Sequence, residues 1–211
     1  MAGRLFSRRI LNGVFFRSFS MKGINLKKGP HDYPVPTGSD HWRRKIRTLF
    51  KSMDTDGDGY VTKKDFELSA HRLTSYLNLN EKKAKEVLKM RLLAWEVVSK
   101  GKHDDCSISE DEYVSSIYDA CSAYSELFIK IIISECDFAD ANDDGFITRD
   151  EHKAFFYGRG VPVKHSADVF KVLDTDGDGI LSREEFIQGA VDFVFSEDEN
   201  SPYVHFIGPL V

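Results

Sequence analysis

Oxygen-bearing side chains recur at alternate positions in one twelve-residue stretch, residues 174–185. The acidic residues at its positions 1, 3, 5 and 12 are Asp174, Asp176, Asp178 and Glu185. Gly179, at position 6, suits the sharp turn that such a loop requires. Ca²⁺ takes about six to eight oxygen ligands, and a loop with this spacing adds the backbone carbonyl of Ile180 at position 7. The stretch therefore predicts a Ca²⁺ site that Glu185 closes with both of its oxygens.

Two further stretches repeat this pattern, one starting at residue 54 and the other at residue 140. Each has an oxygen-bearing side chain at positions 1, 3, 5, 9 and 12 and a glycine at position 6. With the position-7 carbonyl included, the predicted ligands are Asp54, Asp56, Asp58, Tyr60 and Asp65 in the stretch that starts at residue 54, and Asp140, Asn142, Asp144, Phe146 and Glu151 in the stretch that starts at residue 140. The chain is thus expected to hold three Ca²⁺ ions.

The gap between the first two loops is long enough to contain one more, and residues 101–112 fit it in a degraded form. Ile108 and Glu112 stand at positions 8 and 12, but position 1 is not acidic and Cys106 replaces the glycine. We expect this loop to bind Ca²⁺ poorly, if at all. Its Ile108 can still form the short strand that joins paired loops, as Val61, Ile147 and Leu181 can in the other three.

Apolar residues at intervals of three to four flank every loop and predict helices on both sides. Trp42, Ile46, Phe50 and Met53 precede the first loop, and Ala84, Leu88, Leu92 and Trp95 precede the degraded one. Helix–loop–helix units of this kind resemble EF-hands, which bury their apolar faces in pairs. The predicted fold is all-α, with four EF-hands in two pairs that form one compact domain. Its expected parts are a leader and linker over 1–38, the first pair over 39–122, the second pair over 123–195 and a tail over 196–211 that packs back on the domain.

Position 12 distinguishes the first loop from the other two. Asp65 is one methylene shorter than Glu151 and Glu185, so it reaches the metal with both oxygens only if the loop tightens. Fewer oxygen ligands suit octahedral Mg²⁺ better than Ca²⁺. We therefore expect the first site to bind Ca²⁺ more weakly, or to exchange it with Mg²⁺.

The first twenty residues have a different composition from the rest of the chain. They contain four arginines, several serines and scattered apolar residues, and no acidic residue precedes Asp32. This composition is typical of a mitochondrial transit peptide. A disordered basic tail on a cytoplasmic protein is the alternative, and the Pro- and Gly-bearing stretch 29–38 is expected to be a linker.

Composition also argues against several functions. No apolar run is long enough to span a membrane, and a net charge of −5 disfavours a nucleic-acid partner. The three cysteines match no zinc spacing and are expected to be reduced. The seven histidines form no metal-ligand pattern and are expected on the surface, and no nucleophile motif is present, so the chain is not expected to be an enzyme.

Three intact hands, a degraded second hand and a first loop ending in Asp resemble a known group of proteins. The group comprises the sarcoplasmic calcium-binding proteins, calexcitin, and the coelenterazine-binding proteins and photoproteins, and the resemblance covers about residues 40–211. It implies a monomeric Ca²⁺ buffer or transporter. A Ca²⁺-triggered binding protein for an apolar, luciferin-like small molecule and a dedicated Ca²⁺ sensor are the alternatives. Lys45, Ile46 and Ala190 stand where photoproteins carry their reacting groups, so light emission is not expected.

Overall fold

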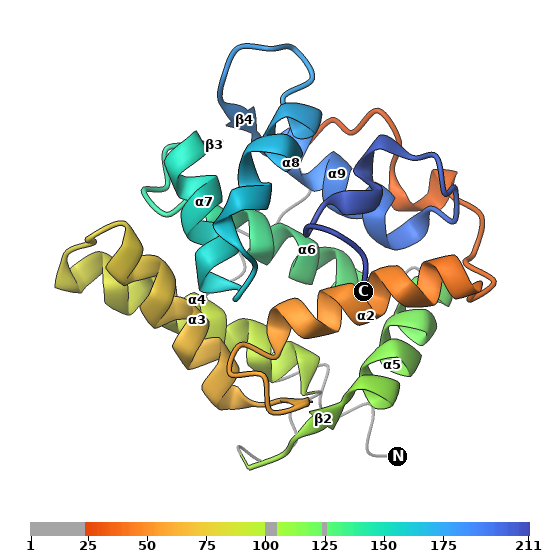
Figure 1. Cartoon of the computed structure of the whole chain (residues 1–211), viewed down its shortest axis with the longest axis horizontal. Helices are drawn as coiled ribbons and strands as arrows, with labels where there is room; N and C mark the ends of the chain where they lie inside the picture. The colour runs from red at the N-terminus through yellow and green to blue at the C-terminus, as the bar shows by residue number, and fades with distance from the viewer. Residues whose placement is uncertain (1–23, 100–104, 124–125) are drawn as a thin grey trace.

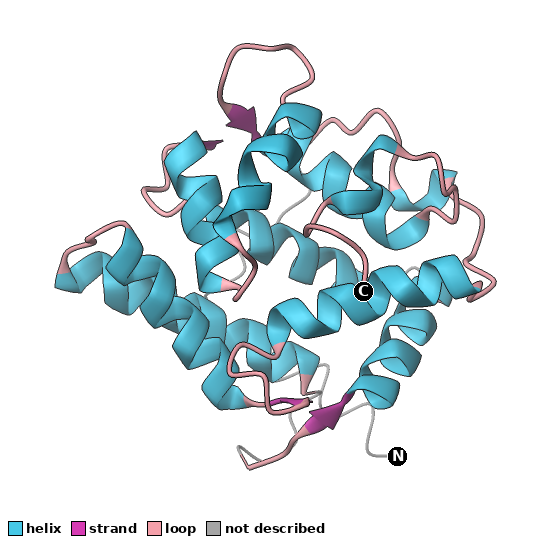
Figure 2. Ribbon diagram, viewed as in Figure 1, coloured by secondary structure: helices cyan, strands magenta, loops and turns pink. Residues whose placement is uncertain are grey.

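The computed structural model describes residues 24–99, 105–123 and 126–211 (Figure 1). The predicted transit peptide and the first four positions of the degraded loop lie outside these residues. Helices dominate the described part, and four short strands are its only sheet structure (Figure 2). The prediction of an all-α fold is confirmed. None of the described helices is long and apolar enough to cross a membrane.

Within the described residues, each half of the chain has four α-helices and two strands. The first half contains α2 (Asp40–Met53), β1 (Tyr60–Val61), α3 (Lys63–Tyr76), α4 (Glu81–Val98), β2 (Ile108–Ser109) and α5 (Glu110–Ser122). The second contains α6 (Glu126–Ala139), β3 (Phe146–Ile147), α7 (Arg149–Gly158), α8 (Ser166–Leu173), β4 (Leu181–Ser182) and α9 (Arg183–Phe195). Three short 3₁₀ helices complete the fold, η1 (Pro30–Asp32), η2 (Val163–His165) and η3 (Pro202–His205).

The strands pair the loops two by two, at opposite ends of the molecule (Figure 1). β1 and β2 are antiparallel with Val61 opposite Ile108, and β3 and β4 are antiparallel with Ile147 opposite Leu181. The four residues are those at position 8 of each loop, and all four are buried. The prediction that the degraded loop keeps its strand pairing is therefore confirmed.

The residues at positions 9 and 12 of each loop also start the helix that follows. Thr62 with Asp65, Ser109 with Glu112, Thr148 with Glu151 and Ser182 with Glu185 each form a capping box, in which the two residues satisfy each other's backbone amides. Such a box stabilises the first turn of a helix. The degraded loop has kept this structural role.

The predicted core is correct for α2 and only partly correct for α4. Trp42, Ile46, Phe50 and Met53 are all buried. In α4 the predicted Trp95 is buried, but Leu88 is 37% exposed and Ala84 and Leu92 are half-buried. Val87, Arg91 and Ala94 are buried as well, and Arg91 pairs with Glu135 of α6.

Two titratable side chains of the helices, His152 and Lys45, are buried, which the sequence analysis did not predict. His152 was expected on the surface but is 0% exposed, and its Nδ1 lies 2.8 Å from Ser166 Oγ, which links α7 to α8. Burial lowers the pKa of His152 to about 3, so the ring is neutral. Lys45 of α2 donates to the carbonyls of Phe193 and Ser196 at the C-terminal end of α9. Burial lowers the pKa of Lys45 to about 8.

The segments at both ends of the described chain pack against α9. The stretch predicted as a linker lies along this helix, with Tyr33 buried and its hydroxyl donating to Asp192 Oδ2 at 2.9 Å. The C-terminal tail places Phe206 and Ile207 in the core. Figure 1 shows the C-terminus beside α2, where the Val211 amide donates to Thr48 Oγ1 at 3.1 Å.

Candidate calcium sites

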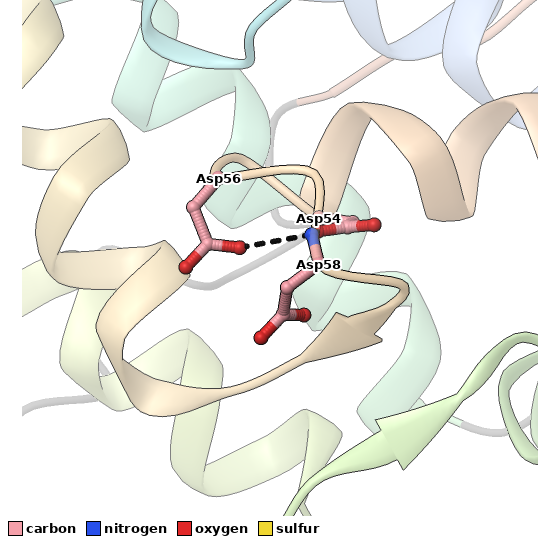
Figure 3. Close-up of side chains that lie close together, drawn as sticks. All are labelled: Asp54, Asp56 and Asp58. Carbon is pink, nitrogen blue, oxygen red and sulfur yellow. Dashed lines mark hydrogen bonds between the residues drawn. The ribbon is translucent and has the colours of Figure 1, made fainter.

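The first loop gathers three carboxylates at the end of α2 (Figure 3). Oxygens of Asp54, Asp56 and Asp58 lie within 4.8 Å of one another. Backbone amides hold them in place: Asp54 Oδ1 accepts from Gly57 N at 2.9 Å, and Asp58 N donates to Asp56 Oδ1 at 3.2 Å. The three like charges are thus brought together by the loop itself, an arrangement that a divalent cation would neutralise.

Left-handed backbone at positions 4 and 6 turns each intact loop around its carboxylates. At position 6, φ is 90° for Gly59, 91° for Gly145 and 89° for Gly179. Residues with a Cβ adopt such angles only at a cost, so glycine is the residue that the turn favours. Asp143 at position 4 of the third loop also has a positive φ, of 63°, which Asp tolerates better than most residues.

The fourth loop gathers the carboxylates at positions 1, 3 and 12. Oxygens of Asp174, Asp176 and Glu185 lie within 4.8 Å of one another. Asp174 Oδ1 is buried and has no hydrogen-bond donor among the described residues. A buried carboxylate oxygen without a donor is costly, and a bound cation would satisfy it. This chemistry fits the predicted Ca²⁺ site.

The same loop fixes Glu185 through hydrogen bonds to both of its oxygens. Oε1 accepts from Thr175 N at 2.8 Å, and Oε2 accepts from Ser182 N at 3.0 Å. Burial raises the pKa of Glu185, but the hydrogen bonds from Ser182 and Thr175 outweigh that effect and hold it below its usual value. The carboxylate is therefore ionised at neutral pH, as a metal ligand must be.

The third loop uses an amide in place of one carboxylate. Asn142 Oδ1 accepts from Asp144 N at 2.9 Å, while Asn142 Nδ2 donates to Asp144 Oδ2 at 2.9 Å. Asp140 Oδ2 accepts from Gly145 N at 3.0 Å, and Glu151 Oε2 accepts from Thr148 N at 3.0 Å. The oxygen donors of this loop are therefore held by the same kind of backbone contact as in the other two.

Asp65 at position 12 of the first loop is placed differently from Glu185. It is 1% exposed, and its oxygens accept from Thr55 N and Thr62 N, both at 2.8 Å. In the described residues, the cluster of the first loop comprises positions 1, 3 and 5, whereas that of the fourth includes position 12. The shorter side chain therefore leaves its carboxylate further from the other ligands.

The predicted position-7 residues are placed with their side chains outside the loops. Tyr60 is 49% exposed and Phe146 is 45% exposed, while Ile180 is half-buried. These residues are expected to contribute only their carbonyls, so the identity of the side chain is not constrained by the metal.

A buried cluster of charged residues, which we call the charged cluster, joins the two halves of the molecule. It consists of Arg91 of α4, Glu135 of α6 and Arg159, which follows α7. Arg91 Nη1 lies 2.6 Å from Glu135 Oε1, and Arg159 Nη1 lies 2.9 Å from Glu135 Oε2. Arg159 Nη2 also donates to Ser52 Oγ of α2 at 3.0 Å, two residues before the first loop. Sequence reasoning missed this cluster because its members are far apart in the chain and charged residues on helices usually face solvent.

An apolar cavity of about 50 Å³ adjoins the charged cluster. It is lined by residues from both halves, including Met53, Tyr113, Phe128, Ile131, Phe155, Phe193 and Phe206, and by Glu135 and Arg159. Cavities that hold drug-sized ligands measure about 300 Å³ or more. The cavity as it stands is thus suited only to a small molecule.

Family models match two parts of the chain. The model of an EF-hand domain pair matches residues 137–191, and that of a single EF hand matches residues 46–68. These ranges contain the third and fourth loops and the first loop, respectively.

Whole-chain comparisons find similar proteins of two kinds. A sarcoplasmic calcium-binding protein from Perinereis vancaurica tetradentata is 32% identical over 82% of this chain and 100% of its own length. A luciferin-binding protein from Renilla reniformis is 27% identical over 80% of this chain and 94% of its own. Among solved structures, the coelenterazine-binding protein from Renilla muelleri, in its Ca-loaded apo form, is similar with a TM-score of 0.71, at 27% identity over 82% of this chain and 99% of that one.

Proposed function

The chain belongs to the sarcoplasmic calcium-binding protein family, and from this membership we propose that it buffers Ca²⁺ with three metal sites. The observation that carries the number of sites is the geometry of the three intact loops. Each holds its oxygen donors in place with backbone amides, and each is paired with a neighbour through a strand. The degraded second loop contributes pairing but no site.

The ligands that we propose are those predicted from the sequence. The site in the first loop is formed by Asp54, Asp56, Asp58, the Tyr60 carbonyl and Asp65, that in the third by Asp140, Asn142, Asp144, the Phe146 carbonyl and Glu151, and that in the fourth by Asp174, Asp176, Asp178, the Ile180 carbonyl and Glu185. We further propose that Mg²⁺ competes at the first site. The position of Asp65, which lies outside the carboxylate cluster of its loop, supports this proposal.

A buffer fits the structure better than a sensor of the calmodulin type. Such sensors expose a Met-lined groove when Ca²⁺ opens the helix pair. Here the helices that would have to move are tied across the two halves, because Glu135 of α6 pairs with both Arg91 and Arg159. The whole chain contains only four methionines.

Small-molecule binding is the second candidate, and the named relatives favour it. One relative is called a luciferin-binding protein and one similar structure a coelenterazine-binding protein, and neither is named as an enzyme. The cavity between the halves of this chain is the corresponding place to look. Its volume of about 50 Å³ disfavours a ligand of luciferin size unless the helices separate.

A calcium titration of the full chain by calorimetry tests the buffer proposal. We expect three equivalents of Ca²⁺ to bind, with the weakest site lost first when Mg²⁺ is added. Fluorescence of a hydrophobic dye should stay unchanged during the titration, because a buffer exposes no new apolar face. Binding of two or fewer equivalents would contradict the site assignment, and a large rise in dye fluorescence would indicate a sensor.

The cellular compartment and the oligomeric state are separate proposals. We propose that the Arg-rich leader over residues 1–20 directs mitochondrial import, on its composition alone. A monomer is expected, since the strands of each loop pair are satisfied within one chain. Fluorescent fusions with and without residues 1–20 test the first proposal, and sedimentation tests the second.

A further inference from the structure

The apolar cavity contains polar groups whose hydrogen bonds are incomplete. Arg159 lines it and is 1% exposed, yet its Nε has no acceptor among the described residues. A buried donor without an acceptor is costly. Nη1 and Nη2 donate to Glu135 and Ser52, so Nε is the guanidinium nitrogen that has no acceptor among the described residues.

A second hydrogen-bond donor that lines the same cavity, the Tyr113 hydroxyl, has only a weak acceptor. Tyr113 is buried, and its hydroxyl donates to the thioether sulfur of Met53 at 3.0 Å. A thioether is a weak acceptor, so a carboxylate or carbonyl oxygen in reach would compete with it effectively. Met53 directly follows Ser52, which accepts a hydrogen bond from Arg159 Nη2. Tyr113 and Arg159 thus bond to adjacent residues of α2, and both line the cavity, so we treat them as one polar end of it.

The charge at this end is positive. Two arginines and one glutamate give a formal charge of +1, and Glu135 is paired with both Arg91 and Arg159. A net charge buried away from water is costly unless it is paired. The rest of the lining is apolar, with Phe128, Ile131 and Phe193 among its residues.

These observations lead us to propose that the cavity binds a small monocarboxylic acid. Its carboxylate accepts hydrogen bonds from Arg159 Nε and Tyr113 Oη and neutralises the excess charge. Its apolar body lies among the aromatic and aliphatic side chains that line the rest of the cavity. The site is separate from the metal loops, since Arg159 and Tyr113 are not among the predicted ligands.

The size of the cavity limits the class of ligand. About 50 Å³ of free volume admits the shortest aliphatic acids directly. Longer chains require the apolar side chains around the cavity to shift, which is costly in a close-packed interior. We therefore expect affinity to be highest for acids with few carbon atoms beyond the carboxylate.

The test compares acids with neutral analogues of the same shape. Acetate and butyrate, with acetamide and butyramide as controls, are titrated into the Ca²⁺-loaded full chain and followed by NMR chemical shifts and calorimetry. We expect each acid to bind at least about tenfold more tightly than its amide, because hydrogen bonds to a charged acceptor are the stronger ones. Equal affinity of acid and amide, or no binding of either at millimolar concentration, would overturn the proposal.

Two variants locate the site. Tyr113→Phe keeps the ring and should weaken binding of the acids about tenfold, while Arg159→Gln should remove the preference for acid over amide. Tyr118→Phe is the matched control, because Tyr118 lies on the same helix without lining the cavity, and it should leave affinity unchanged. If Arg159→Gln fails to fold, the test rests on Tyr113→Phe. An affinity of Tyr113→Phe for the acids equal to that of the wild type would refute the assignment. A Ca²⁺ titration of the same samples separates failure of this site from failure of the buffer proposal.

Discussion

At the scale of single residues, position 12 decides how an intact loop closes. Glu185 lies in one cluster with Asp174 and Asp176 while accepting hydrogen bonds from Thr175 and Ser182. Asp65 accepts the equivalent bonds from Thr55 and Thr62, but its carboxylate stays outside the cluster. The first and fourth loops thus differ both in the length of the side chain at position 12 and in whether that carboxylate lies in the cluster.

Lengthening this side chain should convert the first site into a stronger Ca²⁺ site. We expect Asp65→Glu to raise its Ca²⁺ affinity by about tenfold, or ~1.4 kcal/mol, because the second oxygen then reaches the metal. Calorimetry with and without Mg²⁺ measures the change. The converse substitution, Glu185→Asp, is the control and should weaken the fourth site by a similar factor. Unaltered affinity in Asp65→Glu would show that length at position 12 is not limiting.

The clusters of acidic side chains could be predicted from the sequence because each loop is contiguous. A twelve-residue stretch brings its own side chains together, so spacing alone predicts that Asp174, Asp176 and Glu185 lie close to one another. The pairing of Val61 with Ile108 could also be predicted, since position 8 survives in the degraded loop. The burial of His152 could not, because its partner Ser166 lies on another helix and no local pattern records that contact.

At the scale of helices, the charged cluster holds α4, α6 and α7 together. Arg91 lies over the ring of Phe66 at 4.6 Å and over that of Phe138 at 4.4 Å, so the guanidinium is packed as well as paired. With Arg91 packed in this way, α4 turns a charged residue toward the core. The apolar pattern of its sequence did not predict this. A periodic pattern locates a helix, but a buried ion pair with a residue of another helix leaves no trace in it.

Removing the shared carboxylate should therefore destabilise the whole fold. Burial raises the pKa of Glu135, but Arg159 and Arg91 more than offset this and hold it below its usual value, so it is charged at neutral pH. Glu135→Gln leaves two buried arginines without a counter-charge and should cost about 3–5 kcal/mol of the free energy of unfolding.

Urea denaturation at neutral pH measures this loss. Glu81→Gln serves as the control, since Glu81 pairs with Lys85 on the surface and exposed pairs contribute at most about 1 kcal/mol. The lowered pKa of Glu135 also fixes the sign of the pH effect. The wild-type advantage over Glu135→Gln should be full at neutral pH and vanish as the pH falls through that lowered pKa. Equal stability of the two proteins at neutral pH would contradict the role given to the cluster.

At the scale of the whole molecule, α9 is the helix on which both ends of the described chain converge. Phe206 of the tail packs against the rings of Phe186 and Phe193, with centroids 5.2 Å and 6.0 Å away. Gly189 of α9 permits this approach, because a Cβ there would collide with the side chain of Leu173 and meet Phe206 at 3.2 Å. The tail therefore covers core side chains beside α9 and is itself part of the core.

Truncation of the tail should expose the core without touching a metal loop. A chain that ends at Asn200 loses Phe206 and Ile207, which are 6% and 2% exposed. Each buried side chain of this size contributes about 1.5–3 kcal/mol, so the loss should be about 3–6 kcal/mol. We expect a lower melting temperature and strong fluorescence of a hydrophobic dye even with Ca²⁺ bound. Deleting Val211 alone, which is 48% exposed, should change neither quantity by much. Dye fluorescence at the wild-type level in the truncated chain would mean that the tail does not cover the core in solution.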